Sequence, residues 1–156
     1  FDVQVGDAVG GYQESKFFEA GDKVAVAKTP FGNIGLMVCY DLRFPELALM
    51  LRQQGANILT APAAFTYTTG QLHWQLLLQA RAMDSQCYVL GAAQQGWHGE
   101  QRQTWGHAGI TDSRGQLLEM INTEGHGLMT CPFDLAEQNA IRLAMPLMQH
   151  RKLIHY

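Results

Sequence analysis

The sequence predicts an α/β protein, in which strands form an internal sheet and helices pack on the outside. Short apolar runs of strand length recur along the chain, amphipathic segments with helical spacing lie between them, and turn residues separate the elements. The chain of 156 residues is 47% hydrophobic and 16% charged. That composition is typical of a globular domain, and we expect a single domain over residues 1–156.

The first half of the chain predicts strands on either side of a helix. Residues 1–22 carry glycines without clear periodicity, so we expect a loop. Residues 23–28 alternate as a short strand, and Ile34–Val38 is apolar enough for a strand buried on both faces. Pro45 suits the first turn of a helix that ends near Gly55. A further strand is expected at 57–61.

The second half predicts a helix, a strand, a polar loop, a two-stranded hairpin, another strand and a short helix. These elements are expected at residues 71–86, 87–93, 94–103, 108–111 with 116–121, 128–133 and 135–143. The helices should cover the sheet formed by the strands.

Composition also excludes several classes of function. The net charge is −3 and the basic residues are scattered, so the basic stripe of a nucleic-acid-binding protein is missing. No apolar run approaches the ~20 residues that span a bilayer, and no signal segment is visible, so we expect a cytoplasmic protein without membrane contact. The cysteines and histidines lack metal-ligand spacing, and we expect neither a metal nor a cofactor.

Cys39 is the first candidate functional residue. It lies where a predicted strand ends and a helix is about to start, a position that presents a side chain at the sheet edge near backbone amides. A thiolate there could attack a carbonyl carbon. The alternative is a packing role, as expected for Cys87 and Cys131. The nearby charges could likewise be an ion-pair network at the helix start, formed by Asp41, Arg43 and Glu46.

The segment V-C-Y-D-L-R-F-P-E at 38–46 resembles the nucleophile motif of the nitrilase superfamily, the carbon–nitrogen hydrolases. Other segments resemble the family in the same order: F-D-V at 1–3, Q-E-S at 13–15, P-F-G-N-I-G-L-M at 30–37, G-A-N-I-L at 55–59, P-A-A-F-T at 62–66, H-W at 73–74, A-R-A at 80–82 and W-G-H at 105–107. The 92–98 loop and the Q-H-R-K near the end are similar to the Nit branch, and within it to deaminated-glutathione amidases.

The resemblance implies a four-layer α-β-β-α sandwich of which this chain is the C-terminal portion, incomplete at the N-terminus. It implies that Cys39 is the nucleophile, that the backbone N–H of Tyr40 helps to hold the oxyanion, and that Glu14 in Q-E-S is a second glutamate orienting lysine and substrate. The family's base glutamate and its lysine match no position here and are expected before Phe1. The chain alone should then be a very weak amidase or none, with apolar sheet surface exposed.

Three further residues are candidates for the substrate pocket. Phe65 and Tyr67 follow a strand end, where loops often carry specificity. Arg43 could bind a substrate carboxylate or pair with Glu46, and we favour the structural role. Arg81 is expected to be a surface residue on a core-packing helix.

The sequence leaves several functions open. The leading one is cleavage of a small amide, similar to deaminated glutathione, through a thioester. The alternatives are an omega-amidase acting on 2-oxo acid amides, a non-catalytic remnant, and a redox-sensing thiol, which would need a second cysteine close to Cys39. The partner is a small-molecule amide substrate. A homo-oligomer, a dimer, is expected if the fold is complete.

Overall fold

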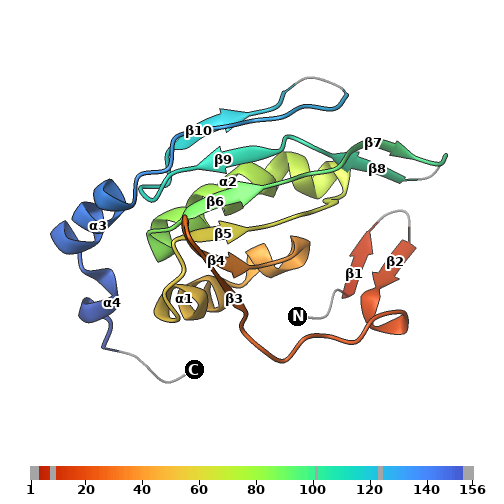
Figure 1. The fold of residues 1–156 in the computed structure, drawn as a ribbon. Coiled ribbons are helices and arrows are strands. Elements are labelled where there is room, and N and C mark those ends of the chain that lie inside the picture. The colour runs from red at the N-terminus through yellow and green to blue at the C-terminus, as the bar shows by residue number, and fades with distance from the viewer. Residues whose placement is uncertain (1–3, 8–9, 101, 123–124, 153–156) are drawn as a thin grey trace.

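The computed structural model describes residues 4–7, 10–100, 102–122 and 125–152, and its centre is a six-stranded sheet (Figure 1). The strand order is β10-β9-β6-β5-β4-β3. These strands are β3 (Val26–Thr29), β4 (Gly32–Leu36), β5 (Ile58–Thr60), β6 (Tyr88–Gly91), β9 (Gly109–Thr111) and β10 (Leu117–Met120). Strands β4, β5 and β6 run parallel, and the flanking pairs are antiparallel. The predicted α/β class is confirmed.

Two helices connect the parallel strands and cover one face of the sheet. Helix α1 (Pro45–Gln53) joins β4 to β5, and α2 (Tyr67–Ser85) joins β5 to β6 (Figure 1). The core between helices and sheet is apolar and fully buried at Leu51, Leu59, Leu78 and Val89. Helix α2 begins at Tyr67 rather than at residue 71. Its first turn is polar, with the hydroxyls of Thr66 and Thr69 at 2.7 Å from each other, so the apolar spacing does not mark the start of the helix.

Close packing of the helices depends on glycines in the strands. A Cβ added at Gly35 would lie 2.8 Å from Leu59 Cδ2 and 3.1 Å from Leu51 Cβ. A Cβ at Gly91 would lie 2.7 Å from the Trp74 ring. Such distances are too short for ordinary contact, so glycine allows the helices to approach the backbone of β4 and β6.

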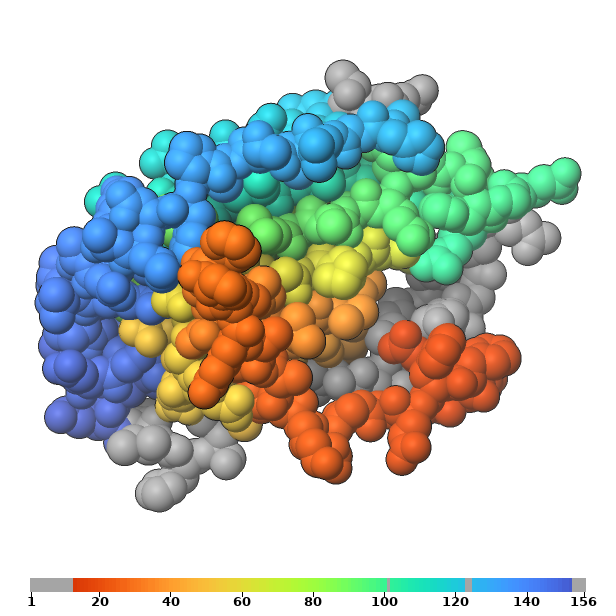
Figure 2. Space-filling view, viewed as in Figure 1, coloured from red at the N-terminus to blue at the C-terminus, as the bar shows by residue number. Residues whose placement is uncertain are grey.

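The opposite face of the sheet lacks a covering helix layer in the described part of the chain. Side chains alternate along a strand, so Leu36 points away from the face on which Gly35 meets α1. Leu36 is 48% exposed and Val38 is 59% exposed. Figure 2 looks onto this face, where the yellow and green strands reach the surface. The prediction that Ile34–Val38 is buried on both faces is therefore wrong, because helices cover one side.

Two hairpins form where loops were expected. Strands β1 (Gln4–Asp7) and β2 (Gly10–Gln13) pair antiparallel within the predicted loop 1–22, and the short helix η1 (Glu14–Lys16) follows. Strands β7 (Gln95–His98) and β8 (Arg102–Trp105) pair within and beyond 94–103. Backbone hydrogen bonds hold these hairpins together. Because their sequences are largely polar, they lack the apolar alternation by which strands are recognised.

The predicted strand 128–133 does not form in the described structure, although the hairpin of β9 and β10 does. The segment is instead anchored by aromatic packing, with the Phe133 ring 4.9 Å from that of Tyr88. Helix α3 (Leu135–Ala144) follows, as predicted, and Asp134 caps it by accepting from Ala136 N–H and Glu137 N–H. A short helix, α4 (Leu147–His150), was not predicted.

Helix α3 is fixed to the amino-terminal end of β5 and β6 by one buried amide. The side chain of Gln138 donates to the carbonyls of Asn57 (2.9 Å) and Gln86 (3.2 Å) and accepts from Asn57 Nδ2 (3.0 Å). Gln138 is fully buried, so these bonds satisfy a polar group that would otherwise destabilise the fold. Among the helices of the described residues, none has the length and apolar character needed to cross a bilayer.

Candidate active site

Cys39 lies directly beyond β4, at the carboxyl end of the parallel strands. Its N–H donates to Pro62 O at 2.9 Å, which continues the parallel pairing to the β5 side. The backbone then turns with φ of +47° at Cys39, and a short helix, η2 (Cys39–Arg43), begins. A non-glycine residue in this left-handed region costs about 1–3 kcal/mol and is concentrated at functional sites. The thiol thus occupies a sharp turn between strand and helix.

Asp41 holds this turn in place. Its carboxylate accepts from Val38 N–H at 2.9 Å, and its own N–H donates to Val38 O at 2.9 Å. These reciprocal bonds cap the first turn of η2 and restrain the backbone on both sides of Cys39.

Some groups around the Cys39 sulfur oppose ionisation of the thiol, and others favour it. Burial raises the pKa of the thiol above its ordinary value of 9.0, and the carboxylate of Glu14 adds to that effect. The backbone N–H of Ala64, the guanidinium of Arg102 and the backbone N–H of Tyr40 all lower it, by a smaller amount. Cys39 is half-buried rather than sealed in the core. The net result is a thiol that is accessible but protonated at neutral pH.

The structure brings Glu14 and Tyr40, both predicted, into the electrostatic surroundings of Cys39. Phe65 lies in the core instead, 6% exposed, with its ring packed edge-on at 5.1 Å from that of Trp74. Tyr67 is exposed at the start of α2. Tyr40 is partly exposed, so of these residues only Phe65 is withdrawn from solvent.

Arg43 does not form the predicted pair with Glu46. Its Nη1 lies 3.3 Å from His73 Nδ1, and its guanidinium lies 5.2 Å from the centre of the Phe65 ring and 5.7 Å from that of Tyr40. These are cation–π distances. The side chain packs over two rings beside the thiol turn, the ring of Tyr40 in η2 and that of Phe65 in the β5–α2 loop.

Arg81 is also placed differently from the prediction. It is 7% exposed rather than a surface residue, and its Nη1 lies 3.4 Å from Asp84 Oδ2. Burial lowers the pKa of Arg81, while the carboxylates of Asp84 and Glu46 oppose that effect. The apolar spacing of α2 identified the face of the helix that packs on the core, but it did not show that Arg81 is buried as well.

Two groups beside the thiol were missed by sequence reasoning. Ala64 contributes its backbone N–H, which no side-chain pattern reveals. Arg102 comes from the β7–β8 hairpin, which was expected to be a loop, and its Nη2 donates to Ala64 O at 3.2 Å. A lone arginine in a polar stretch carries no signal of its own, since its place depends on how the hairpin folds back.

Two cavities of substantial size, each about 470 Å³, lie elsewhere on the molecule, and neither is lined by Cys39. In the part of the chain that the structure describes, no three His, Cys, Asp or Glu side chains gather as metal ligands would. The candidate site therefore consists of a thiol, backbone N–H groups, one carboxylate and one guanidinium.

An accessible cysteine at a strained strand–helix turn, with N–H groups around its sulfur, suits acyl transfer by a thiol. The family model of the carbon–nitrogen hydrolases matches residues 6–143. The chain belongs to the carbon–nitrogen hydrolase family, so the resemblance to the nitrilase superfamily is confirmed.

Individual relatives agree with this family. The chain is 44% identical over 154 residues to the deaminated glutathione amidase of Yersinia enterocolitica, covering 99% of this chain and 54% of that protein. The crystal structure of C. elegans NitFhit superposes with a TM-score of 0.81 at 38% identity, over 97% of this chain and 37% of that one. Saccharomyces cerevisiae Nit3 gives a TM-score of 0.82 at 31% identity, over 95% and 56%. The chain spans about half the length of such relatives.

Proposed function

We propose that this chain is of an amidase lineage and cleaves a small amide, similar to deaminated glutathione, through a thioester on Cys39. The observation that carries the proposal is the position of the Cys39 thiol. It projects from a left-handed turn at the end of a central parallel strand, with the N–H groups of Ala64 and Tyr40 beside the sulfur. The named activity of the Yersinia relative supports the choice of substrate.

The proposed reaction has two steps. In the first, the Cys39 sulfur bonds to the amide carbonyl carbon, the carbon–nitrogen bond breaks, and the thiol proton leaves with the nitrogen as an amine, which is ammonia only where the amide is primary. In the second, water attacks the thioester carbon, the carbon–sulfur bond breaks, and the acid and the free thiol are released. The backbone N–H of Tyr40 is suited to stabilising the carbonyl oxygen as negative charge develops on it.

The described residues support this chemistry incompletely. Burial keeps the pKa of Cys39 above its ordinary value, so a base must remove its proton during attack. Glu14 is a carboxylate within electrostatic range of the thiol, and Arg102 is a cation within the same range. The base and lysine that the family pattern implies match no residue between 1 and 156. We therefore expect the 156-residue chain by itself to turn over amide very slowly.

The test is to incubate the chain with deaminated glutathione and, in parallel, with a 2-oxo acid amide, and to follow the amine released (the dipeptide cysteinylglycine or ammonia, respectively) and the mass of the Cys39 peptide. We expect an acyl mass on Cys39 from deaminated glutathione and slow release of the dipeptide, both abolished in Cys39→Ala. An acyl mass from the 2-oxo acid amide alone would favour an omega-amidase. Equal release of the amine product by wild type and Cys39→Ala, or an acyl mass on another residue, would overturn the proposed mechanism.

A further inference from the structure

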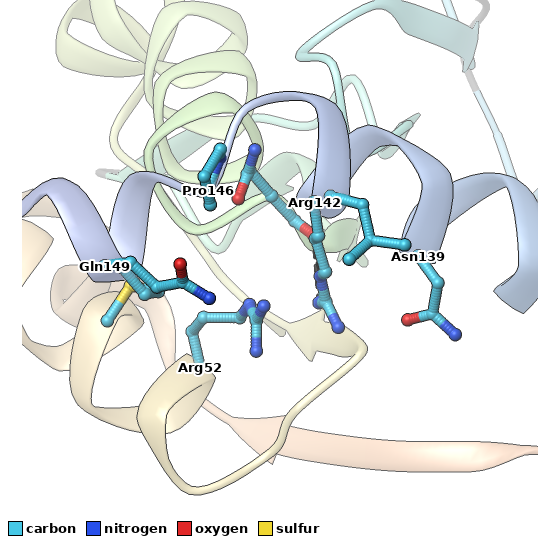
Figure 3. Close-up of a pocket in the computed structure, with 8 residues that line it drawn as sticks. Arg52, Asn139, Arg142, Pro146 and Gln149 are labelled. Carbon is cyan, nitrogen blue, oxygen red and sulfur yellow. Dashed lines mark hydrogen bonds between the residues drawn. The ribbon is translucent and has the colours of Figure 1, made fainter.

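A second site is suggested by a cavity at the end of the sheet opposite to Cys39. The cavity has a volume of about 470 Å³ and lies among α1, α3, α4 and the end of α2 (Figure 3). That volume is within the range of small-molecule sites, about 300–1,000 Å³. Its polar lining comes from Arg52, Gln86, Asn139, Arg142 and Gln149. Gln86 precedes β6 at its amino end, whereas Cys39 follows the carboxyl end of β4, so the two places are separate.

Arg142 is held rigidly at the edge of this cavity. Its Nε and Nη2 donate to Gln86 O at 3.1 and 2.9 Å, and Nη2 also donates to Ala56 O at 3.1 Å. Its Nη1 donates to none of the described residues. Three bonds to main-chain carbonyls fix the plane of the guanidinium without neutralising its charge.

Arg52 approaches the same cavity from α1, and Figure 3 shows both arginines projecting into it. The Nε of Arg52 is buried and has no hydrogen-bond partner among the residues that the structure describes. A buried N–H of a charged group without an acceptor is destabilising and rare. Arg52 therefore has unused donor capacity beside the cavity that its side chain lines.

The two charges are not balanced locally. Among the described residues, those that line the cavity include no aspartate or glutamate. Burial and the positive charge of Arg52 lower the pKa of Arg142, whereas the Cys87 thiol, which accepts from Arg142 Nη2 at 3.3 Å, raises it. The two cations therefore repel each other across the cavity. An anion placed between them would remove this repulsion.

We propose that this cavity binds an oxyanion, the carboxylate or phosphate group of a small metabolite, between Arg52 and Arg142. Guanidinium groups are planar donors that match both kinds of oxyanion and are used to bind them. The amides of Asn139 and Gln149 line the same cavity and can donate to further oxygens of the ligand. The site lies away from the thiol, so its occupancy is independent of the proposed amidase reaction.

The test uses the 156-residue chain with inorganic phosphate in one arm and succinate in the other, with sodium chloride adjusted to hold ionic strength constant. We expect at least one of the two to raise the thermal midpoint saturably and to give a measurable Kd by calorimetry. The arm that responds identifies the group. The absence of saturable binding in both arms, up to concentrations on the order of 10 mM, would overturn the proposal.

Two variants assign the binding to the cavity. Arg52→Gln removes a guanidinium that makes no bond needed for the fold, and it should weaken binding by about tenfold or more. Asn139→Asp places a carboxylate in the cavity and should weaken binding similarly. Lys28→Gln removes one exposed positive charge on β3 and should leave the Kd unchanged. If Arg52→Gln and Asn139→Asp both bind as wild type does, the anion is held elsewhere and the proposal is wrong.

Discussion

At the scale of single residues, the ionisation of Cys39 is a balance among four neighbours. Burial and Glu14 raise its pKa, whereas Arg102 and the N–H groups of Ala64 and Tyr40 lower it. Burial is the largest of these effects, because the thiolate loses water that the backbone donors replace in part. The side chains at 14 and 102 act in opposite directions on the same sulfur.

That opposition gives a paired prediction. Glu14→Gln should lower the pKa of Cys39 and make its alkylation by iodoacetamide faster at about pH 8, and Arg102→Gln should make it slower. The rate is measured by peptide mass spectrometry. Cys131 is the internal control, since its pKa depends on burial and Glu119 rather than on either substituted residue. Changes of the same sign in both variants would contradict the assigned surroundings.

Much of the site could be predicted from the sequence, but for different reasons. The strand-end position of Cys39 follows from local pattern, because an apolar run and a helix start flank it. The proximity of Glu14 rests on resemblance to a family, since no spacing connects residues 14 and 39. Arg102 could not be predicted, because its position depends on a polar hairpin without apolar periodicity. The packing partner of Arg43 was misjudged, because a sequence shows charge neighbours and not aromatic faces.

At the scale of elements, the position of the thiol depends on how closely α1 packs on β4. Gly35 lies on β4 shortly before the thiol turn, and its lack of a side chain lets Leu51 and Leu59 meet over the strand. If this contact were forced apart, β4 and the turn that follows it would shift relative to β5.

Gly35→Ala should therefore destabilise the chain by about 1–3 kcal/mol, the usual cost of overpacking a core. The new Cβ would lie 2.8 Å from Leu59 Cδ2, and no flexible polar side chain is there to yield. The measurement is urea unfolding followed by circular dichroism. Gly21→Ala is the matched control, because nothing lies within 4 Å of the added Cβ. Equal midpoints for the two variants would show that the packing is looser than described.

Elements that bury apolar faces were the ones that sequence predicted well. The helix from Pro45 has an apolar stripe at helical spacing, the parallel strands are short apolar runs, and all of them form. Both hairpins in polar segments were missed, and the 128–133 segment was wrongly assigned as a strand. In that segment aromatic packing of Phe133 on Tyr88 takes the place of ladder hydrogen bonds.

At the scale of the whole molecule, the burial of thiols makes the free energy of unfolding depend on pH in the alkaline range. Burial raises the pKa of both Cys39 and Cys87 above 9.0. The folded chain then keeps these protons at a pH where the unfolded chain has lost them. Their contribution to stability is fully present below pH 9.0 and is lost as pH rises above it.

The free energy of unfolding, measured by urea titration, should fall above pH 9, and the fall should be shallower in Cys87→Ala. An unchanged slope would contradict this.

The open face of the sheet predicts association. Leu36 and Val38 expose apolar surface on a face without a covering layer in the described structure, and such surface favours self-association and dye binding. We expect anilinonaphthalene sulfonate fluorescence and a mass that rises with concentration in light scattering. Leu36→Thr should reduce both, whereas Leu72→Gln, on an exposed position of α2, should not. A monodisperse monomer that binds no dye would show that the face is protected.

The role of Cys39 as the nucleophile is tested most directly by substrate protection. The chain is alkylated with iodoacetamide near pH 9 at increasing concentrations of deaminated glutathione, and the labelling of Cys39 and Cys131 is followed separately. Our account predicts that labelling of Cys39 slows saturably while that of Cys131 is unchanged. Equal labelling of Cys39 with and without the amide, or equal slowing at both cysteines, would contradict it.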